Sequence, residues 1–189
     1  WASRLGADAM ARYLLASMQA EGIDCSKVVC DPTQRTGFLF KGQVTDGSDP
    51  PVEYHRKGSA ASLMGPADVD EVWLRSARHL HATGVFAAIS DTSLQASRKT
   101  MEVMRAAGRS ISFDPNLRPS LWASPEHMRT SINALAALAD WVLHLAPPPT
   151  HGDTDPRTRR LLRVLARGGT VKRIVYASTS GVYGDCGGA

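Results

Sequence analysis

The sequence is short of cysteine and of long apolar runs, and both shortages narrow the class of protein. The chain of 189 residues holds only Cys25, Cys30 and Cys186, with no Cys-x-x-Cys pair and no histidine at zinc-ligand spacing. An odd, scattered set of cysteines is typical of free thiols in a reducing compartment, so we expect a cytoplasmic protein without a metal site. No apolar run reaches the roughly 18 residues that cross a bilayer, so we expect no membrane partner.

The N-terminus lacks two further features. Residues Trp1–Gly6 begin without Met, and they do not show the basic and then apolar pattern of a secretory signal. We therefore expect the chain to be a piece of a longer protein.

A strong excess of charge is missing as well. The net charge is +4, and most of the local excess lies between Arg157 and Arg173. Apolar residues such as Leu161 and Val164 separate these charges, and the first aromatic residue after them is Tyr176. This pattern favours the solvated face of a helix over a nucleic-acid patch, so we expect no nucleic-acid partner.

What is present is an alternation of two kinds of apolar pattern, which predicts an α/β fold. From residue 76 onward predicted strands alternate with predicted helices, as in right-handed βαβ crossovers with a parallel sheet. A predicted hairpin at 36–56, with a strong turn signal at 45–51, lies outside this alternation. Strands are expected at 23–29, 79–84, 111–113, 140–145 and 173–177, and helices at 8–21, 68–76, 93–107, 124–138 and 158–167.

Three polar residues follow the predicted strand at 111–113. Pro115 forbids a regular ladder, so the chain leaves the sheet at Asp114, and Asn116 and Arg118 come next on the loop. Open α/β sheets bind ligands at this edge. Arg118 can present its planar guanidinium to a carboxylate or a phosphate. From the residues alone, a solvated arginine in a proline-rich turn is an equal alternative.

The stretch Asp114-Pro-Asn-Leu-Arg-Pro-Ser-Leu-Trp122 resembles a motif of the ribokinase-like (phosphofructokinase B) sugar kinases, and most closely of the 2-keto-3-deoxygluconate kinases. The resemblance runs from residue 1 to about residue 143, and it includes Thr36–Phe38 and Tyr54–Arg56. It implies a partial three-layer αβα ribokinase-like fold with a lid hairpin at about 36–56. It also implies phosphorylation of 2-keto-3-deoxygluconate, or of a similar sugar acid, with ATP and Mg²⁺.

The same resemblance implies which residues bind the sugar acid. They are Tyr54 and Arg56 on the second lid strand and Arg118 on the loop, with Asp114 and Asn116 in support. Without the resemblance, Tyr54 and Arg56 are an ordinary cross-strand pair on a surface hairpin. The lid hairpin is also the candidate surface for a homodimer.

The sequence lacks the residues that phosphoryl transfer requires. The reaction needs an anion hole at a helix N-terminus and a base for the attacking hydroxyl. In the resembled family a Gly-Ala-Gly-Asp motif supplies both, and neither it nor a Gly-x-x-x-x-Gly-Lys-Ser loop occurs here. We therefore expect this chain alone to be inactive.

Residues 140–189 resemble another family, the extended short-chain dehydrogenase/reductases of the NAD(P)-dependent epimerase and dehydratase type. The resemblance rests mainly on Val171–Asp185, which contains Ser-Thr-Ser-Gly-Val-Tyr-Gly. It implies a Rossmann-like βαβ fragment, in which Thr179 aligns with the residue that hydrogen-bonds the reacting carbonyl. We predict a truncated sugar-kinase domain at 1–143 and a truncated reductase-like segment at 144–189. The alternatives to a kinase are an NAD(P)-dependent epimerase fragment and a non-catalytic fusion fragment.

Two histidines alternate on the predicted strand at 79–84. His79 and His81 would face the same side, which suits either a metal pair or core histidines that hydrogen-bond to backbone. We expect the second arrangement, because histidines on a strand are more often core residues than metal ligands.

Overall fold

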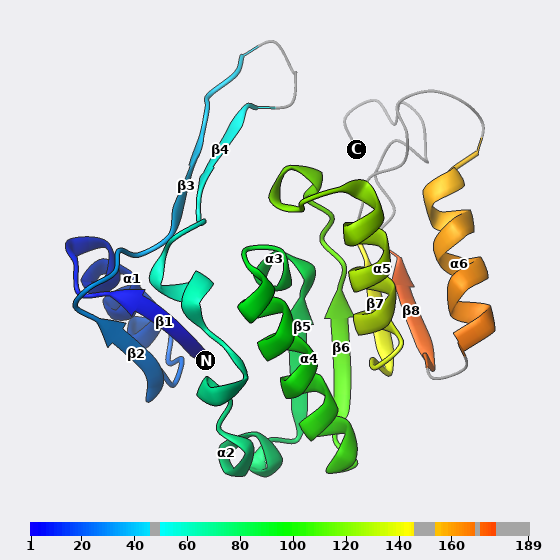
Figure 1. The fold of residues 1–189 in the computed structure, drawn as a ribbon, viewed down its shortest axis with the longest axis horizontal. Helices are drawn as coiled ribbons and strands as arrows, with labels where there is room; N and C mark the ends of the chain where they lie inside the picture. The colour runs from blue at the N-terminus through cyan, green and yellow to red at the C-terminus, as the bar shows by residue number, and fades with distance from the viewer. Residues whose placement is uncertain (46–49, 146–153, 169–170, 177–189) are drawn as a thin grey trace, which may run out of the picture. The chain divides into compact units, whose positions relative to one another are not determined.

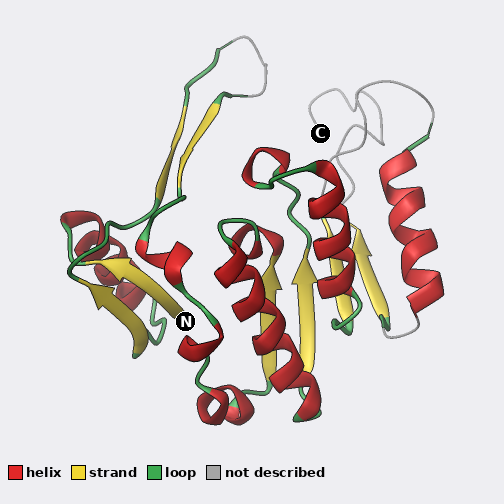
Figure 2. Cartoon of the chain, viewed as in Figure 1, coloured by secondary structure: helices red, strands yellow, loops and turns green. Residues whose placement is uncertain are grey.

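The computed structural model describes residues 1–45, 50–145, 154–168 and 171–176, and the chain divides into two compact units (Figure 1). Unit 1 consists of Trp1–Asp68 and Ile89–Ala96, and unit 2 consists of Val69–Ala88 and the chain from Ser97 onward. Unit 1 holds two two-stranded sheets and unit 2 holds one four-stranded sheet, and the strands are yellow in Figure 2. The proposed boundary at residue 143 stays a prediction.

Unit 1 contains a parallel pair of strands and an antiparallel hairpin. Strand β1 (Ala2–Gly6) pairs with β2 (Lys27–Asp31), and helix α1 (Ala9–Ala20) connects them. Strands β3 (Phe38–Lys41) and β4 (Val52–His55) form the predicted lid hairpin. Two 3₁₀ turns follow, η1 (Ala60–Leu63) and η2 (Pro66–Asp68).

Unit 2 is built on a parallel sheet in the order β5-β6-β7-β8, which confirms the predicted α/β class. Every crossover in it passes through helical structure, as the sequence pattern predicts. The strands are β5 (His79–Thr83), β6 (Ser110–Asp114), β7 (Trp141–His144) and β8 (Arg173–Tyr176). The helices are α2 (Glu71–Ser76), α3 (Gly84–Ala87), α4 (Asp91–Ala106, which begins in unit 1), η3 (Pro119–Leu121), α5 (Pro125–Ala136) and α6 (Pro156–Gly168).

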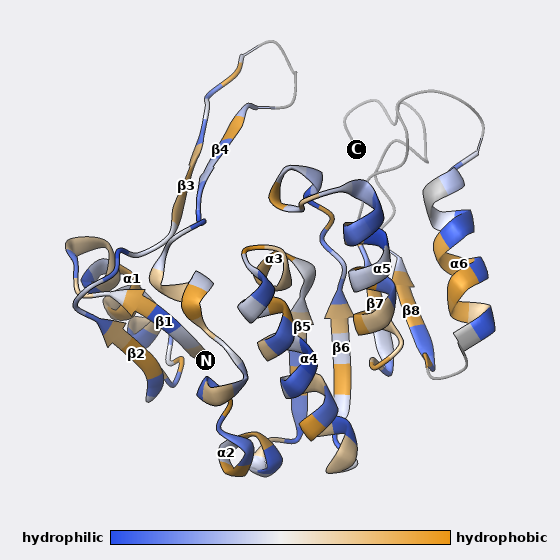
Figure 3. Ribbon diagram, viewed as in Figure 1, coloured by the Kyte–Doolittle hydropathy of each residue, from blue (hydrophilic) through white to orange (hydrophobic). Residues whose placement is uncertain are grey.

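The core of unit 2 lies between one face of the sheet and helices α4 and α5 (Figures 1 and 3). Strand β6 is its centre, because Ile111 and Phe113 are fully buried and point to the same side. Helix α5 starts as its sequence predicts, since Ser124 accepts a hydrogen bond from the His127 amide at 3.0 Å. The remaining large side chains of this core are Met101, Met104, Leu135 and Val142.

The expectation that His79 and His81 are core residues bonded to backbone is wrong. Both side chains are exposed, on the side of β5 opposite to the helices. The two ring nitrogens of His79 lie 2.8 Å from the hydroxyls of Ser110 and Ser112, and Nδ1 of His81 lies 2.9 Å from that of Ser112. Strand alternation placed both histidines on one side but could not tell which side the helices cover.

Several boundaries differ from the predicted ones for local reasons. Strand β2 begins at Lys27 rather than at residue 23, because Asp24 accepts a hydrogen bond from the Ser26 amide at 2.8 Å and makes a turn there. Residues 59–65 hold the turn η1 instead of being only loop. The sequence patterns also missed β1 and the one-turn helix α3, which are short and weakly patterned.

Gly84 allows strand β5 to end directly against the loop that follows β6. A Cβ atom at this position would lie 2.2 Å from the Pro115 carbonyl oxygen and 2.7 Å from Cδ1 of Ile132. Backbone atoms cannot yield as a flexible side chain can, so only glycine fits here. The close approach fixes where the Asp114 loop leaves the sheet.

Asp8 anchors the first lid strand to the start of α1. Its carboxylate accepts hydrogen bonds from the amides of Ala11 and Thr36 and from the Thr36 hydroxyl, each at 2.8 Å. The Thr36 hydroxyl in turn accepts a hydrogen bond from the Gly6 amide at 3.0 Å. These bonds, that from the Thr36 amide first and that from Ala11 next, lower the pKa of Asp8 below its usual 3.8.

We expect Gly84→Ala to lower the free energy of unfolding by about 1–3 kcal/mol, because the new methyl group overlaps the Pro115 carbonyl. Urea denaturation of the full chain measures this. The matched control is Gly65→Ala, whose Cβ would lie 3.9 Å from Cβ of Thr92 and makes an ordinary contact. Equal effects of the two substitutions would contradict the assignment.

Asp8 predicts a pH dependence of stability. Because its pKa is lowered in the folded state, its contribution is present above the usual value of 3.8 and is lost as the pH falls through the folded pKa. The stability advantage of the wild type over Asp8→Asn should therefore shrink between about pH 5 and pH 2. Chemical denaturation at a series of pH values measures the difference, and a constant advantage would disprove this role.

Candidate functional site

The predicted sugar-acid residues fall into two groups, one in each unit. Tyr54 and Arg56 belong to unit 1, whereas Asp114, Asn116 and Arg118 belong to unit 2. The structure brings the members of each group together. The meeting of Arg56 with Arg118 on one ligand stays a prediction.

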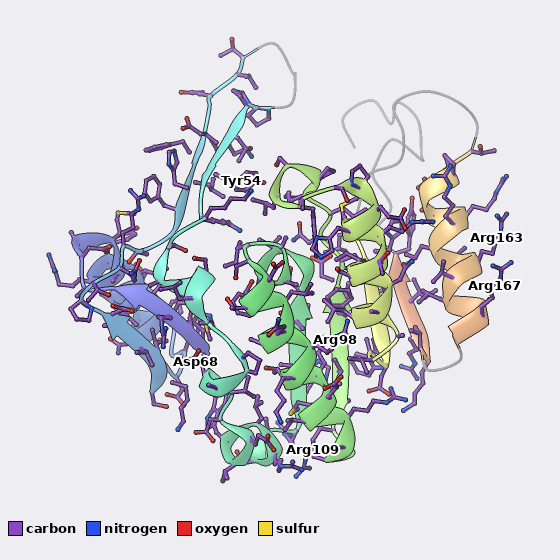
Figure 4. All side chains as sticks on the ribbon, in the orientation of Figure 1. Tyr54, Asp68, Arg98, Arg109, Arg163 and Arg167 are labelled. Carbon is purple, nitrogen blue, oxygen red and sulfur yellow. The ribbon has the colours of Figure 1, made fainter. Side chains whose placement is uncertain are left out.

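In unit 1, the side chains of Tyr54 and Arg56 lie together at the base of the lid. Tyr54 pairs with Leu39 across the hairpin, and its side chain extends from β4 (Figure 4). Arg56 follows the strand on the same side, and its Cζ atom lies 5.3 Å from the centre of the Tyr54 ring. This cation–π contact holds a guanidinium and a phenol side by side, and both are only half-buried.

The other face of the hairpin carries an aromatic cluster that includes His55. The His55 ring stacks on Phe38 with centroids 4.8 Å apart and meets the edge of Phe40 at 5.5 Å. Its Nε2 atom also lies 2.8 Å from the carboxylate of Glu53. His55 therefore packs on the face away from Tyr54 and Arg56.

In unit 2, the loop after β6 is held in a fixed shape by its own polar groups. The buried Asp114 carboxylate accepts hydrogen bonds from the Asn116 amide at 2.9 Å and from the Asn116 side chain at 3.1 Å. Asn116 has a φ of +37°, a conformation that asparagine tolerates better than most residues. Arg118 is exposed next to this turn and donates from Nη1 to the Leu117 carbonyl at 2.9 Å. Asp114 and Asn116 thus fix the shape of the loop next to Arg118, and their supporting role toward a sugar acid stays a prediction.

A cavity of about 1000 Å³ opens beside this loop, at the carboxyl ends of β6 and β7. Helices α5 and α6 form its other walls. One part of its lining is apolar, and the other is basic, with Asp114 as its one carboxylate among the described residues. Because Asn116 already satisfies that carboxylate, the lining suits an anionic ligand with an apolar or hydroxylated body. The apolar residues include Leu117, Met128, Ile132, Leu143, Leu145, Leu161 and Val164, and the basic ones are Arg118, Arg129, Arg160 and Arg163.

The sequence reasoning missed three of the arginines that line this cavity. Arg129 lies on α5, where an ion pair with Glu126 holds it, and Arg160 and Arg163 lie on α6. Figure 4 shows Arg163 projecting from α6. The expectation of an exposed basic helix face is confirmed, since Arg160 and Arg163 are exposed. Nothing in their spacing could reveal that they border the same cavity as Arg118.

His144 also lines the cavity and is buried. Its Nε2 atom lies 2.6 Å from the Thr158 hydroxyl, which donates to the Asp155 carboxylate at 2.5 Å. Because that hydroxyl proton is already donated, the histidine must donate in turn. These contacts fasten α6 to the end of β7.

The remaining sequence-based expectations concern Thr179, metal ligands and membrane-spanning helices. Thr179 lies outside the described residues. Within the parts of the chain that the structure describes, no group of three or more His, Cys, Asp or Glu side chains is placed to hold a metal ion. Among the same residues, no helix has both the length and the apolar character needed to cross a membrane.

Comparison with known proteins identifies the family. The pfkB family carbohydrate kinase model matches residues 1–144. The chain is 42% identical over 142 residues to 2-dehydro-3-deoxygluconokinase from Bacillus subtilis, a match that covers 75% of this chain and 44% of that protein. The chain thus spans less than half the length of this relative.

Solved structures agree with this result. The crystal structure of a PfkB protein from Polaromonas sp. JS666 has a TM-score of 0.82 and 60% identity, over 95% of this chain and 60% of that one. An E. coli protein assigned to ribokinase II, in complex with ATP and Mg²⁺, has a TM-score of 0.75 and 26% identity, over 94% of this chain and 55% of that one.

The Polaromonas match must extend past residue 144, where the family model ends. These relatives lend no support to the epimerase resemblance of residues 140–189 or to NAD(P) as cofactor. Over at least the first 144 residues, the sequence match and the similarity of fold both indicate the same protein family. This chain belongs to the pfkB family of carbohydrate kinases.

Proposed function

We propose that the chain carries the sugar-acid-binding part of a kinase that phosphorylates 2-dehydro-3-deoxygluconate, which is another name for 2-keto-3-deoxygluconate. The observation that carries the proposal is Arg118, held beside a rigid Asp114–Asn116 turn at the mouth of a basic cavity. The similarity to the Bacillus subtilis enzyme supports this choice among sugar substrates.

The proposed ligand matches the chemistry of both groups of residues. A sugar acid has one carboxylate, a keto oxygen and several hydroxyls. Arg118 can bind the carboxylate with two parallel charge-assisted hydrogen bonds. Arg56 and Tyr54 would add a second guanidinium and a hydroxyl from the lid, and closure of the lid would strengthen these contacts by excluding water.

We infer ATP with Mg²⁺ as the phosphoryl donor of the whole enzyme, because a solved relative holds both. Phosphoryl transfer relies on positioning and on stabilisation of the spreading negative charge. The Gly-Ala-Gly-Asp motif that would stabilise this charge does not occur in the present sequence. We therefore expect sugar-acid binding without turnover, and we assign no Mg²⁺ ligand to the described residues.

The lid hairpin supports a further proposal, that two copies of the chain associate through it. The side chain of Phe40 is 61% exposed, and Leu39 and Val52 are also exposed on the same short hairpin. Apolar side chains exposed together often mark a protein interface. We also propose a cytoplasmic location, which free Cys25 and Cys30 support.

The test of the binding site is the affinity for 2-dehydro-3-deoxygluconate. We expect Arg118→Ala to weaken binding about 10- to 100-fold, because a hydrogen bond to a charged group contributes about 1.5–3 kcal/mol. Isothermal titration calorimetry of the full chain measures this. Arg98→Ala is the control, since Arg98 is an exposed arginine of α4 outside the cavity lining. Unchanged affinity for Arg118→Ala would reject the site.

The expected lack of turnover is tested separately. An assay that couples ADP release to NADH oxidation, with ATP, Mg²⁺ and 2-dehydro-3-deoxygluconate, should give no signal above background for this chain. The Bacillus subtilis enzyme, assayed alongside, is the positive control. Robust turnover by this chain would show that its catalytic residues lie outside the expected motif.

A further inference from the structure

Ser59 lies where the two strands of the lid meet the body of unit 1. It is only 1% exposed, and both its amide and its hydroxyl donate to the Arg56 carbonyl, at 3.2 and 2.7 Å. The Ala60 amide donates to the Arg35 carbonyl at 2.9 Å, just before the first lid strand. A Cβ atom on Gly37 would lie 2.9 Å from the Ser59 hydroxyl. Ser59 therefore touches the base of both lid strands.

A second buried serine continues this hydrogen bonding away from the lid. The Ser59 carbonyl accepts hydrogen bonds from the Ser62 amide at 2.9 Å and from the Ser62 hydroxyl at 2.7 Å. The Ser62 carbonyl accepts from the hydroxyls of Ser90 at 2.6 Å and Thr92 at 3.0 Å. A continuous set of hydrogen bonds thus runs from Arg56 to residues at the start of α4.

Reciprocal hydrogen bonds between Ser90 and Ser93 fix the start of α4, where this series of hydrogen bonds ends. The Ser93 amide donates to the Ser90 hydroxyl at 3.0 Å, and the Ser90 amide donates to the Ser93 hydroxyl at 3.1 Å. This reciprocal pair resembles a capping box. Ser93 is fully buried, so it is costly to break these bonds without replacement.

The lid hairpin itself is short. Its strands pair over four residues each, and Phe40 at its outer part is 61% exposed. A short hairpin alone is only marginally stable in water. The backbone of Arg56 therefore depends on contacts at the base of the lid for a fixed conformation, and Ser59 provides two of them.

We propose that Ser59 is a positioning residue for Arg56, and that the Ser59–Ser62–Ser90 hydrogen bonds, which we call the serine relay, attach the lid base to the segment of unit 1 at the start of α4. The relay fixes the Arg56 backbone, and the guanidinium then lies over the Tyr54 ring at 5.3 Å. This inference rests on the proposed function, in which Arg56 binds the sugar acid.

Amide hydrogen exchange tests the relay without a ligand. In the full chain, Ser59→Ala and Ser62→Ala should each speed exchange in residues 52–60 several-fold and leave β1 and β2 unchanged. Ser17→Ala is the matched control, because its hydroxyl donates to the Tyr13 carbonyl at 2.9 Å on exposed helix α1, away from the lid. Unchanged exchange at 52–60, or an equal increase throughout the chain, would overturn the relay.

A double-mutant cycle tests the positioning role. Ser59→Ala should weaken binding of 2-dehydro-3-deoxygluconate about 2- to 10-fold, the usual net effect of one hydrogen bond. In an Arg56→Ala background the same change should have no effect, whereas a merely structural role would give the same loss in both backgrounds. An undiminished effect of Ser59→Ala in that background would overturn the inference.

The same measurements separate this inference from the proposed function. If the wild-type chain does not bind the sugar acid, the proposed function fails, and the exchange comparison still decides the relay. If the chain binds but Arg56→Ala has no effect, Arg56 is not a ligand and the positioning role is overturned. If Arg118→Ala and Arg56→Ala both weaken binding and the cycle shows no coupling, only the role of Ser59 is overturned.

Discussion

The parallel pairing of β6 with β5 and β7 is the constraint on which the cavity of unit 2 depends. Strand β6 is buried, so its residues cannot shift without exposing Ile111 and Phe113. Its end is fixed as well, because Gly84 lies against the Pro115 carbonyl. The Asp114–Asn116 turn and Arg118 directly follow the end of β6, so the fixed end of the strand also fixes where they lie. If Arg118 binds the sugar acid as proposed, the fixed backbone below it would lower the entropy cost of binding.

In unit 1, hydrogen bonds rather than apolar packing hold the base of the lid hairpin in place. Its lid hairpin is short and exposes apolar side chains. Each strand of the lid is attached at its base by hydrogen bonds: Asp8 accepts one from the Thr36 amide, and Ser59 donates to the Arg56 carbonyl. Such contacts are directional, so they fix a backbone conformation that apolar packing alone would leave free. The proposed closure of the hairpin over a sugar acid would require such a fixed base.

How far the site could be predicted depended on whether its residues are neighbours in the sequence. The turn at Asp114 and Asn116 was predictable because proline excludes a strand and the polar residues follow directly. The approach of Arg56 to Tyr54 follows from strand alternation. The arginines of α5 and α6 were not predictable as cavity residues, since a helix face toward solvent and one toward a cavity have the same spacing. The prediction that His79 and His81 are core residues was wrong for a similar reason. Strand alternation does not say which face of a sheet the helices cover.

By itself, the sequence determined the α/β class, the parallel sheet, the hairpin at 36–56 and the family to which the chain belongs. These depend on local periodicity, turn residues and short motifs, which the amino acids specify directly. Only the tertiary structure decided that the Arg118 loop and the basic side of α6 border one cavity, and that serines at 59, 62 and 90 connect the lid base to the start of α4 within unit 1. Those contacts join residues far apart in the chain, and they exist only once packing has brought their elements together.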